Sequence, residues 1–147
     1  MRAVALLALI TAIGFVACDD DDPLGPDIET FNVTLTGAAE APEPGDPNGA
    51  GTAVIEINDT DNEVCWDITV TNITLPATAA HIHEAPAGEP GDIVVTLGAP
   101  DATGTDEDCV DAADNLLDQI LADPDGYYVN VHTTDFPQGA VRGQLSN

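Results

Sequence analysis

Three histidines are the residues of this chain best suited to chemistry. His81 and His83 flank Ile82 in the run Ala-His-Ile-His-Glu, and His132 ends the run Tyr-Tyr-Val-Asn-Val-His. Neutral imidazole nitrogens are ligands that copper and zinc prefer in proteins. If the three side chains converge, they form a three-imidazole site for copper or zinc.

The segments that carry these histidines have the pattern of β-strands. Alternate side chains of a strand share a face, so His81 and His83 point the same way and Ile82 points the other way. The segment 127–133 divides in the same manner. Its apolar face holds Tyr127, Val129 and Val131, and its other face holds Tyr128, Asn130 and His132. If the two strands are neighbours, the three imidazoles meet on one face of a sheet.

A structural role for the same residues is the alternative. Histidines that hydrogen-bond across strands and loops would fix the turn 85–91 and the return at 139–143. We expect Glu84 and Arg142 to take part in this polar cluster. Arg142 lies among many acids, and it is expected to be the centre of an ion pair.

Period-two alternation of apolar residues recurs along the chain. It predicts strands over 31–36, 53–57, 64–71, 92–97 and 140–145, with a hairpin joining the second and third of these. Trp66 is expected to be a large core residue. Residues 98–108 are predicted to form an acidic loop. Short strands at regular spacing indicate a mainly β fold, a sandwich or a barrel.

One helix is predicted over 111–122. Leu116, Leu117, Ile120 and Leu121 fall on one helical face, Asp111 is placed to cap the helix, and Pro124 follows its end.

The N-terminal residues indicate export. Residues 1–17 read as a signal peptide, in which Arg2 precedes an apolar run too short to span a bilayer. The run ends in Phe-Val-Ala-Cys, which resembles a bacterial lipobox and predicts lipid attachment at Cys18. A free Cys18 after ordinary secretion is the alternative. Residues 18–30 are acidic and contain two prolines, which predicts a flexible tether before a domain at 31–147.

The remaining cysteines, Cys65 and Cys109, are expected to form a disulfide. An exported protein folds in an oxidising compartment, where a pair of thiols becomes a bridge. Cys65 alternates with core residues, so we expect a bridge from the outer face to a covering loop. Two buried free thiols are the alternative.

The charge balance excludes several partners. The chain has 27 acidic and 2 basic residues, a formal net charge of −25. Loss of Arg2 with a signal peptide would leave −26. Nucleic acid is excluded as a partner, because phosphate binding needs Lys and Arg. An enzyme is not expected either, since Ser146 is the only serine and lies in no nucleophile motif.

Three motifs in order resemble the CHRD domain, named from chordin and found in many bacterial exported proteins. They are Phe-Asn-Val-Thr-Leu-Thr-Gly-Ala-Ala-Glu-Ala-Pro at 31–42, Ala-His-Ile-His-Glu-Ala-Pro-Ala-Gly at 80–88, and the segment 127–145. The resemblance implies an antiparallel, immunoglobulin-like β-sandwich related to that of copper/zinc superoxide dismutase. It implies no molecular function. Dismutase activity is excluded, because that enzyme needs more histidines than this chain has.

Two function classes therefore follow from the sequence. The first is a non-catalytic binding module without a cofactor, anchored to the cell envelope through lipid on Cys18 and contacting a protein or glycan. The second is an envelope protein that binds copper or zinc through His81, His83 and His132.

Overall fold

The computed structural model describes residues 28–146, which fold into eight strands and one short α-helix. The elements in chain order are β1 (Ile28–Thr36), the 3-10 turn η1 (Gly37–Ala39), β2 (Ala50–Asn58), β3 (Glu63–Thr71), β4 (Ala79–Glu84), β5 (Asp92–Leu97), β6 (Thr105–Asp111), α1 (Asp114–Ala122), the 3-10 turn η2 (Pro124–Gly126), β7 (Tyr127–His132) and β8 (Val141–Gln144). β1 begins before Phe31, where the sequence pattern places the start of the first strand.

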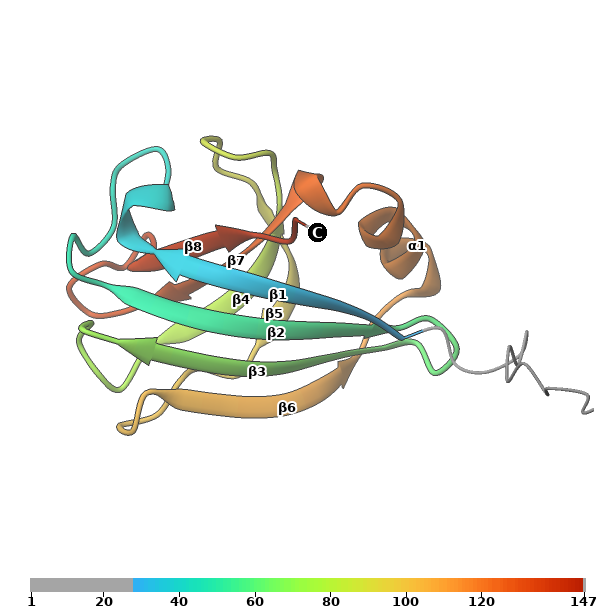
Figure 1. The fold of residues 1–147 in the computed structure, drawn as a ribbon, viewed down its shortest axis with the longest axis horizontal. Helices are drawn as coiled ribbons and strands as arrows, with labels where there is room; N and C mark the ends of the chain where they lie inside the picture. The colour runs from blue at the N-terminus through green and yellow to red at the C-terminus, as the bar shows by residue number, and fades with distance from the viewer. Residues whose placement is uncertain (1–27, 147) are drawn as a thin grey trace, which may run out of the picture.

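All strand pairs are antiparallel, and they join into a single sheet of order β5-β4-β7-β8-β1-β2-β3-β6. The sheet curls until it is nearly closed, like a barrel (Figure 1). β1 and β8 share one register pair, Thr36 with Arg142, so the sheet turns sharply there. The mainly β, antiparallel prediction is confirmed, but the strands form one continuous barrel-like sheet and not the two sheets of the immunoglobulin-like sandwich that the resemblance implied.

The core fills the inside of the curled sheet. Alternate residues of β1, β2 and β3 point inward, and the predicted apolar faces are buried; for example, Phe31, Ile55 and Ile68 are at most 1% exposed. Trp66 is buried as predicted, and its indole nitrogen donates to Asp106 Oδ2 at 2.6 Å. The β2–β3 hairpin is also confirmed. This inward packing leaves the outer face of each strand free to carry polar side chains.

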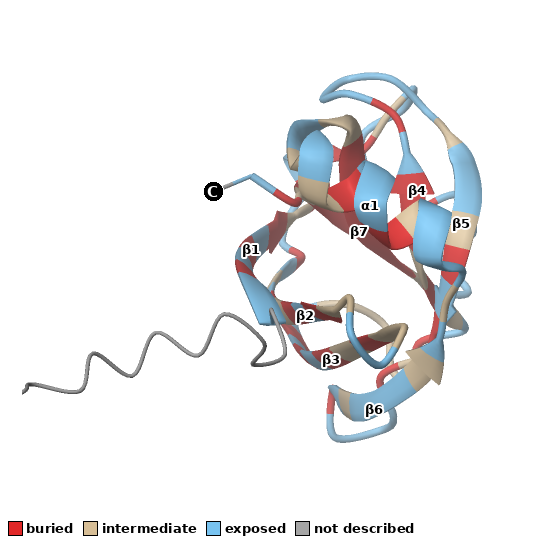
Figure 2. Ribbon diagram, turned by 90° about the vertical axis from the view of Figure 1, so that its right-hand side faces the viewer, coloured by how far each residue is buried: buried red, intermediate tan, exposed pale blue. Residues whose placement is uncertain are grey.

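The short helix α1 lies across one end of the barrel (Figure 2). Two of its own residues, Leu117 and Ile120, are fully buried. The helix begins later than predicted, at Asp114, and its N-cap residue is Ala113, not Asp111. Asp111 ends β6 instead, where it pairs with Glu63 of β3. Within residues 28–146, no helix combines the length and apolar character needed to cross a membrane.

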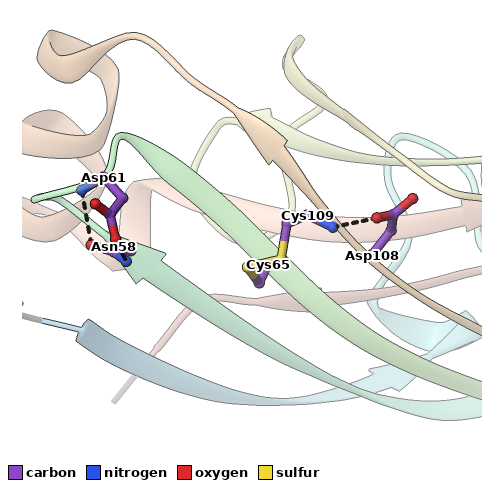
Figure 3. The surroundings of a disulfide bond; sticks show 5 residues. All are labelled: Asn58, Asp61, Cys65, Asp108 and Cys109. Carbon is purple, nitrogen blue, oxygen red and sulfur yellow. Dashed lines mark hydrogen bonds between the residues drawn. A yellow bond between two sulfur atoms is a disulfide. The ribbon is translucent and has the colours of Figure 1, made fainter.

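The prediction of an acidic loop over 98–108 is wrong from Thr105 onward, because β6 begins there. β6 is an edge strand exposed on most positions, so its sequence shows none of the apolar alternation that marks a half-buried strand. The strand is held to β3 by the Cys65–Cys109 disulfide, which confirms the predicted pairing (Figure 3). The bridge joins directly opposed residues of neighbouring strands, not a covering loop.

Candidate metal centre

β4 and β7 bring the three histidines together on the outer face of the sheet. In the β4–β7 register His81 is opposite Asn130, His83 is opposite Tyr128, and Ala79 is opposite His132. His81 and His132 are therefore diagonal neighbours on one face, a spacing that ring side chains can bridge. The apolar residues between them, Ile82 and Val131, point into the core and are fully buried. The prediction that the three histidines share one face of the sheet is confirmed.

The imidazoles are close enough to share one ion. One nitrogen from each of His81, His83 and His132 lies within 4.8 Å of the other two. His81 Nδ1 and His132 Nε2 are 3.1 Å apart. Two nitrogens bound to the same metal at about 2.0–2.1 Å subtend about 100° at that separation, which lies within the range of cis-planar and tetrahedral sites.

The orientation of His132 is set by a backbone carbonyl. Its Nδ1 lies 3.1 Å from Pro137 O. A carbonyl only accepts, so Nδ1 carries the proton and Nε2 presents a lone pair toward His81. Metal-binding histidines commonly donate their second nitrogen to a carbonyl in this way, because it fixes the tautomer and the ring plane. The loop after β7 thus aims His132 at the centre of the cluster.

Both of these imidazoles are kept neutral. Burial, together with smaller effects of the neighbouring His132 and His83 rings, lowers the pKa of His81 to about 4. Burial also lowers the pKa of His132, against the effect of the Pro137 carbonyl, which raises it. A metal ion binds imidazole only in its neutral form. Because both rings are already neutral at neutral pH, metal binding does not first have to remove a positive charge from either ring.

His83 is held more firmly than the other two. It is 7% exposed, its Nδ1 lies 2.9 Å from Gly91 O, and its Nε2 lies 3.1 Å from Asn130 Oδ1. Its ring stacks on Tyr128 with the planes 2° apart and the centroids 4.8 Å apart. These contacts are those expected of a histidine that fixes the turn after β4. His83 therefore has partners outside the cluster at both nitrogens, whereas His132 Nε2 contacts another ring of the cluster.

Arg142 clamps the same turn. It is 1% exposed and donates from Nη1 to Glu89 O at 2.8 Å and from Nη2 to Pro86 O at 2.9 Å. Its guanidinium carbon lies 3.4 Å from the centroid of the Tyr128 ring, a cation–π contact. Gln144 adds a bond to Ala85 O. The only basic side chain among residues 28–146 thus binds carbonyls and an aromatic face.

The structure does not bring Glu84 to Arg142. Glu84 follows His83 in β4, so it faces away from the histidines, and its side chain is exposed. The carboxyl whose charge reaches Arg142 belongs to Glu40, which is 8% exposed and packs against Gly139. Its Oε1 is buried with no hydrogen-bond partner. Burial raises the pKa of Glu40 to about 7, even though Arg142 lowers it.

Sequence reasoning did not single out Glu40, because it stands in a segment rich in Gly and Pro that reads as a loop. Asn130 and Tyr128 were placed on the correct face, but nothing in their spacing shows that they contact His83. Cys18 lies outside the described residues, so its lipid attachment stays a prediction.

The described residues form a barrel-like, antiparallel β domain with a histidine cluster on its outer face. The chain belongs to the CHRD domain family: residues 31–145 match that family, which covers all eight strands apart from the first residues of β1. No curated protein and no solved structure matches the chain significantly.

Proposed function

We propose that this CHRD domain binds a divalent transition-metal ion, copper or zinc, through His81 and His132, with His83 as a third ligand. The observation that carries the proposal is the 3.1 Å contact between His81 Nδ1 and His132 Nε2, in which both rings are neutral. His132 Nε2 presents a lone pair, and His81 Nδ1 donates its proton to it. Once that proton moves to His81 Nε2, two nitrogen lone pairs converge on one point, as a borderline-soft cation requires. His83 lies within reach as a third donor.

The role is binding and not catalysis. We infer that the domain holds or carries the ion outside the cytoplasm, on the mature part of an exported chain. The Cys65–Cys109 disulfide supports an oxidising compartment. Attachment through lipid on Cys18 would keep the domain at the cell envelope. Mass spectrometry of the N-terminal peptide tests this, and an unmodified Cys18 or a different first residue would refute it.

Equilibrium dialysis against Cu²⁺ and Zn²⁺ tests the metal proposal. We expect one tightly bound ion per chain, lost in His81→Ala and in His132→Ala. The 27 acidic residues give a weak background of divalent-ion binding, so the matched control is Asp67→Asn, which removes an exposed acid from β3. Tight binding that persists in the variant lacking all three histidines would show that carboxylates, not imidazoles, hold the ion.

A second candidate function is a non-catalytic module for a protein or glycan partner. It is supported by a groove between the β1–β2 and β7–β8 loops, lined by Pro44, Phe136 and Pro137 among others. To test the module, Phe136 is replaced by a photoreactive residue, and crosslinked partners are sought in envelope preparations. Recovery of no crosslinked species above that of the same probe at exposed Thr69 counts against the module.

A further inference from the structure

The spacing of the three imidazoles and the position of Asn130 bear on which ion the site takes and how His83 joins it. Both points rest on the metal-binding function proposed above.

Two imidazoles are already placed for binding, and the third is not. With bonds of about 2.0–2.1 Å, two ligand nitrogens lie about 2.9 Å apart when cis in a plane, about 3.4 Å apart in a tetrahedron and about 4.1 Å apart when trans. The 3.1 Å separation of the His81 and His132 nitrogens fits a cis pair. The three ligand atoms all lie within 4.8 Å of one another, which accommodates the about 4.1 Å of a trans pair.

A planar, T-shaped arrangement therefore accommodates a wider cluster than a tetrahedral one does. β4 resists contraction because its histidines are on a paired strand, with β5 on one side and β7 on the other. Planar or tetragonal nitrogen coordination is the preference of Cu²⁺, whereas Zn²⁺ takes tetrahedral sites. The rings also meet at steep angles, 87° between His81 and His83 and 63° between His81 and His132, so they do not stack and block the centre.

Asn130 is the residue that holds His83 back. Gly91 O only accepts, so the Nδ1 of His83 carries a proton, and Nε2 is the nitrogen left for a metal. That nitrogen lies 3.1 Å from the Asn130 amide, at the position assigned to Oδ1. A lone pair on Nε2 requires the amide to be turned so that its NH₂ group donates there, and Asn130 then occupies the nitrogen. Asn130 is 2% exposed, and in the β4–β7 register it is opposite His81 and diagonal to His83.

We propose that the site is a tetragonal Cu²⁺ site in which His81 and His132 bind as a cis pair and His83 is recruited by exchanging Asn130 for the ion. Asn130 is thus a specificity-determining residue, since it competes with the metal for Nε2 of His83. The exchange keeps the bond from His83 Nδ1 to Gly91 O, so the turn after β4 stays attached while the ion binds.

Electron paramagnetic resonance of the Cu²⁺-loaded protein tests the geometry. We expect an axial, tetragonal spectrum with hyperfine coupling to three imidazole nitrogens. Co²⁺ loading should give the weak visible absorption of a five- or six-coordinate ion. A strongly absorbing, tetrahedral Co²⁺ spectrum, or a Cu²⁺ signal with only two nitrogens, would overturn the inference while leaving metal binding itself intact.

Asn130→Ala tests the competition. Removal of one neutral hydrogen-bonding competitor should tighten Cu²⁺ binding by roughly three- to tenfold, provided the fold is retained by circular dichroism. If Asn130→Ala unfolds, Asn130→Ser serves the same purpose with a smaller change. Unchanged or weaker Cu²⁺ binding by a folded variant contradicts the role of Asn130. No Cu²⁺ binding by the unaltered protein overturns both this inference and the proposed function.

Discussion

At the scale of single residues, His81 and His132 act as a pair because both are partly withdrawn from water and neither gains a positive charge easily. The pKa of His81 is lowered to about 4. At pH 5.5 an imidazole with an ordinary pKa near 6.5 is about one-tenth neutral, whereas one with a pKa near 4 is almost entirely neutral. Protons therefore compete weakly with a metal at His81.

We predict that zinc affinity, measured by isothermal titration, falls less between pH 7 and pH 5.5 than the roughly tenfold per ligand expected of imidazoles with an ordinary pKa. Stability follows the same direction. The folded state binds fewer protons at these rings than the unfolded chain, so stability decreases as pH falls from about 6.5 toward 4. A loss of about a hundredfold in zinc affinity by pH 5.5 would show that the pair is not kept neutral.

Glu40 has the opposite pH dependence. Its pKa is raised to about 7 by burial, so the folded state binds a proton that the unfolded chain releases near the ordinary pKa of 4.5. Stability therefore decreases as pH rises through that window, by roughly 3 kcal/mol at most.

We predict that Glu40→Gln removes most of this decrease, because an amide of the same shape carries no charge. Urea unfolding at pH 5 and at pH 8 measures it, with the exposed Glu43→Gln as the matched control in the same loop. A Glu40→Gln variant whose stability falls between these pH values as much as that of the unaltered protein would show that the Glu40 carboxyl does not titrate there.

At the scale of elements, the strands β4 and β7 were predictable because their sequences alternate, and alternation alone places His81, His83 and His132 on a common face. The partners of those rings were not predictable. Pro137, Gly91 and Asn130 reach the histidines only through loop conformation and strand register, and neither leaves a periodic signal in the sequence.

β6 is a second element that the sequence did not fully predict. Cysteine count and compartment predict the Cys65–Cys109 pairing, but the strand that carries Cys109 is an exposed edge with acidic residues on both faces. An exposed edge strand needs no apolar stripe, so its pattern is indistinguishable from that of an acidic loop.

We predict that Cys65→Ala with Cys109→Ala lowers the free energy of unfolding by about 3–4 kcal/mol, because the bridge closes a loop with a sequence separation of 44 residues. Amide hydrogen exchange in β6 should accelerate more than exchange in β2, which is paired along its whole length with β1 and β3. Denaturant unfolding gives the first quantity. A loss below about 1 kcal/mol, with β6 exchange unchanged, would mean that strand pairing alone holds this edge.

At the scale of the whole molecule, a formal charge of −25 on 147 residues creates self-repulsion that folding must overcome. Arg142 relieves little of it, because it is buried and binds carbonyl groups. Most of the acidic side chains are exposed, where mobile cations screen them.

We therefore predict that NaCl stabilises the fold. Raising the salt from about 10 mM to about 500 mM should increase Tm by roughly 5–10 °C, which corresponds to about 1–2 kcal/mol for a domain of this size. Thermal denaturation followed by circular dichroism measures the shift, with an equal osmolality of sucrose as the uncharged control. A Tm that does not move with NaCl, or that moves equally with sucrose, contradicts electrostatic self-repulsion as the cause.

The most direct test of the account is a Zn²⁺ titration of ¹⁵N-labelled protein, followed through the imidazole nitrogen resonances. The chain has three histidines, so every ring signal can be assigned with single variants. We predict that His81 Nδ1 and His132 Nε2 shift together and saturate at one equivalent of Zn²⁺, while His132 Nδ1 keeps its proton. Ring signals of His81 and His132 that stay unchanged through one equivalent would contradict a metal centre at this cluster.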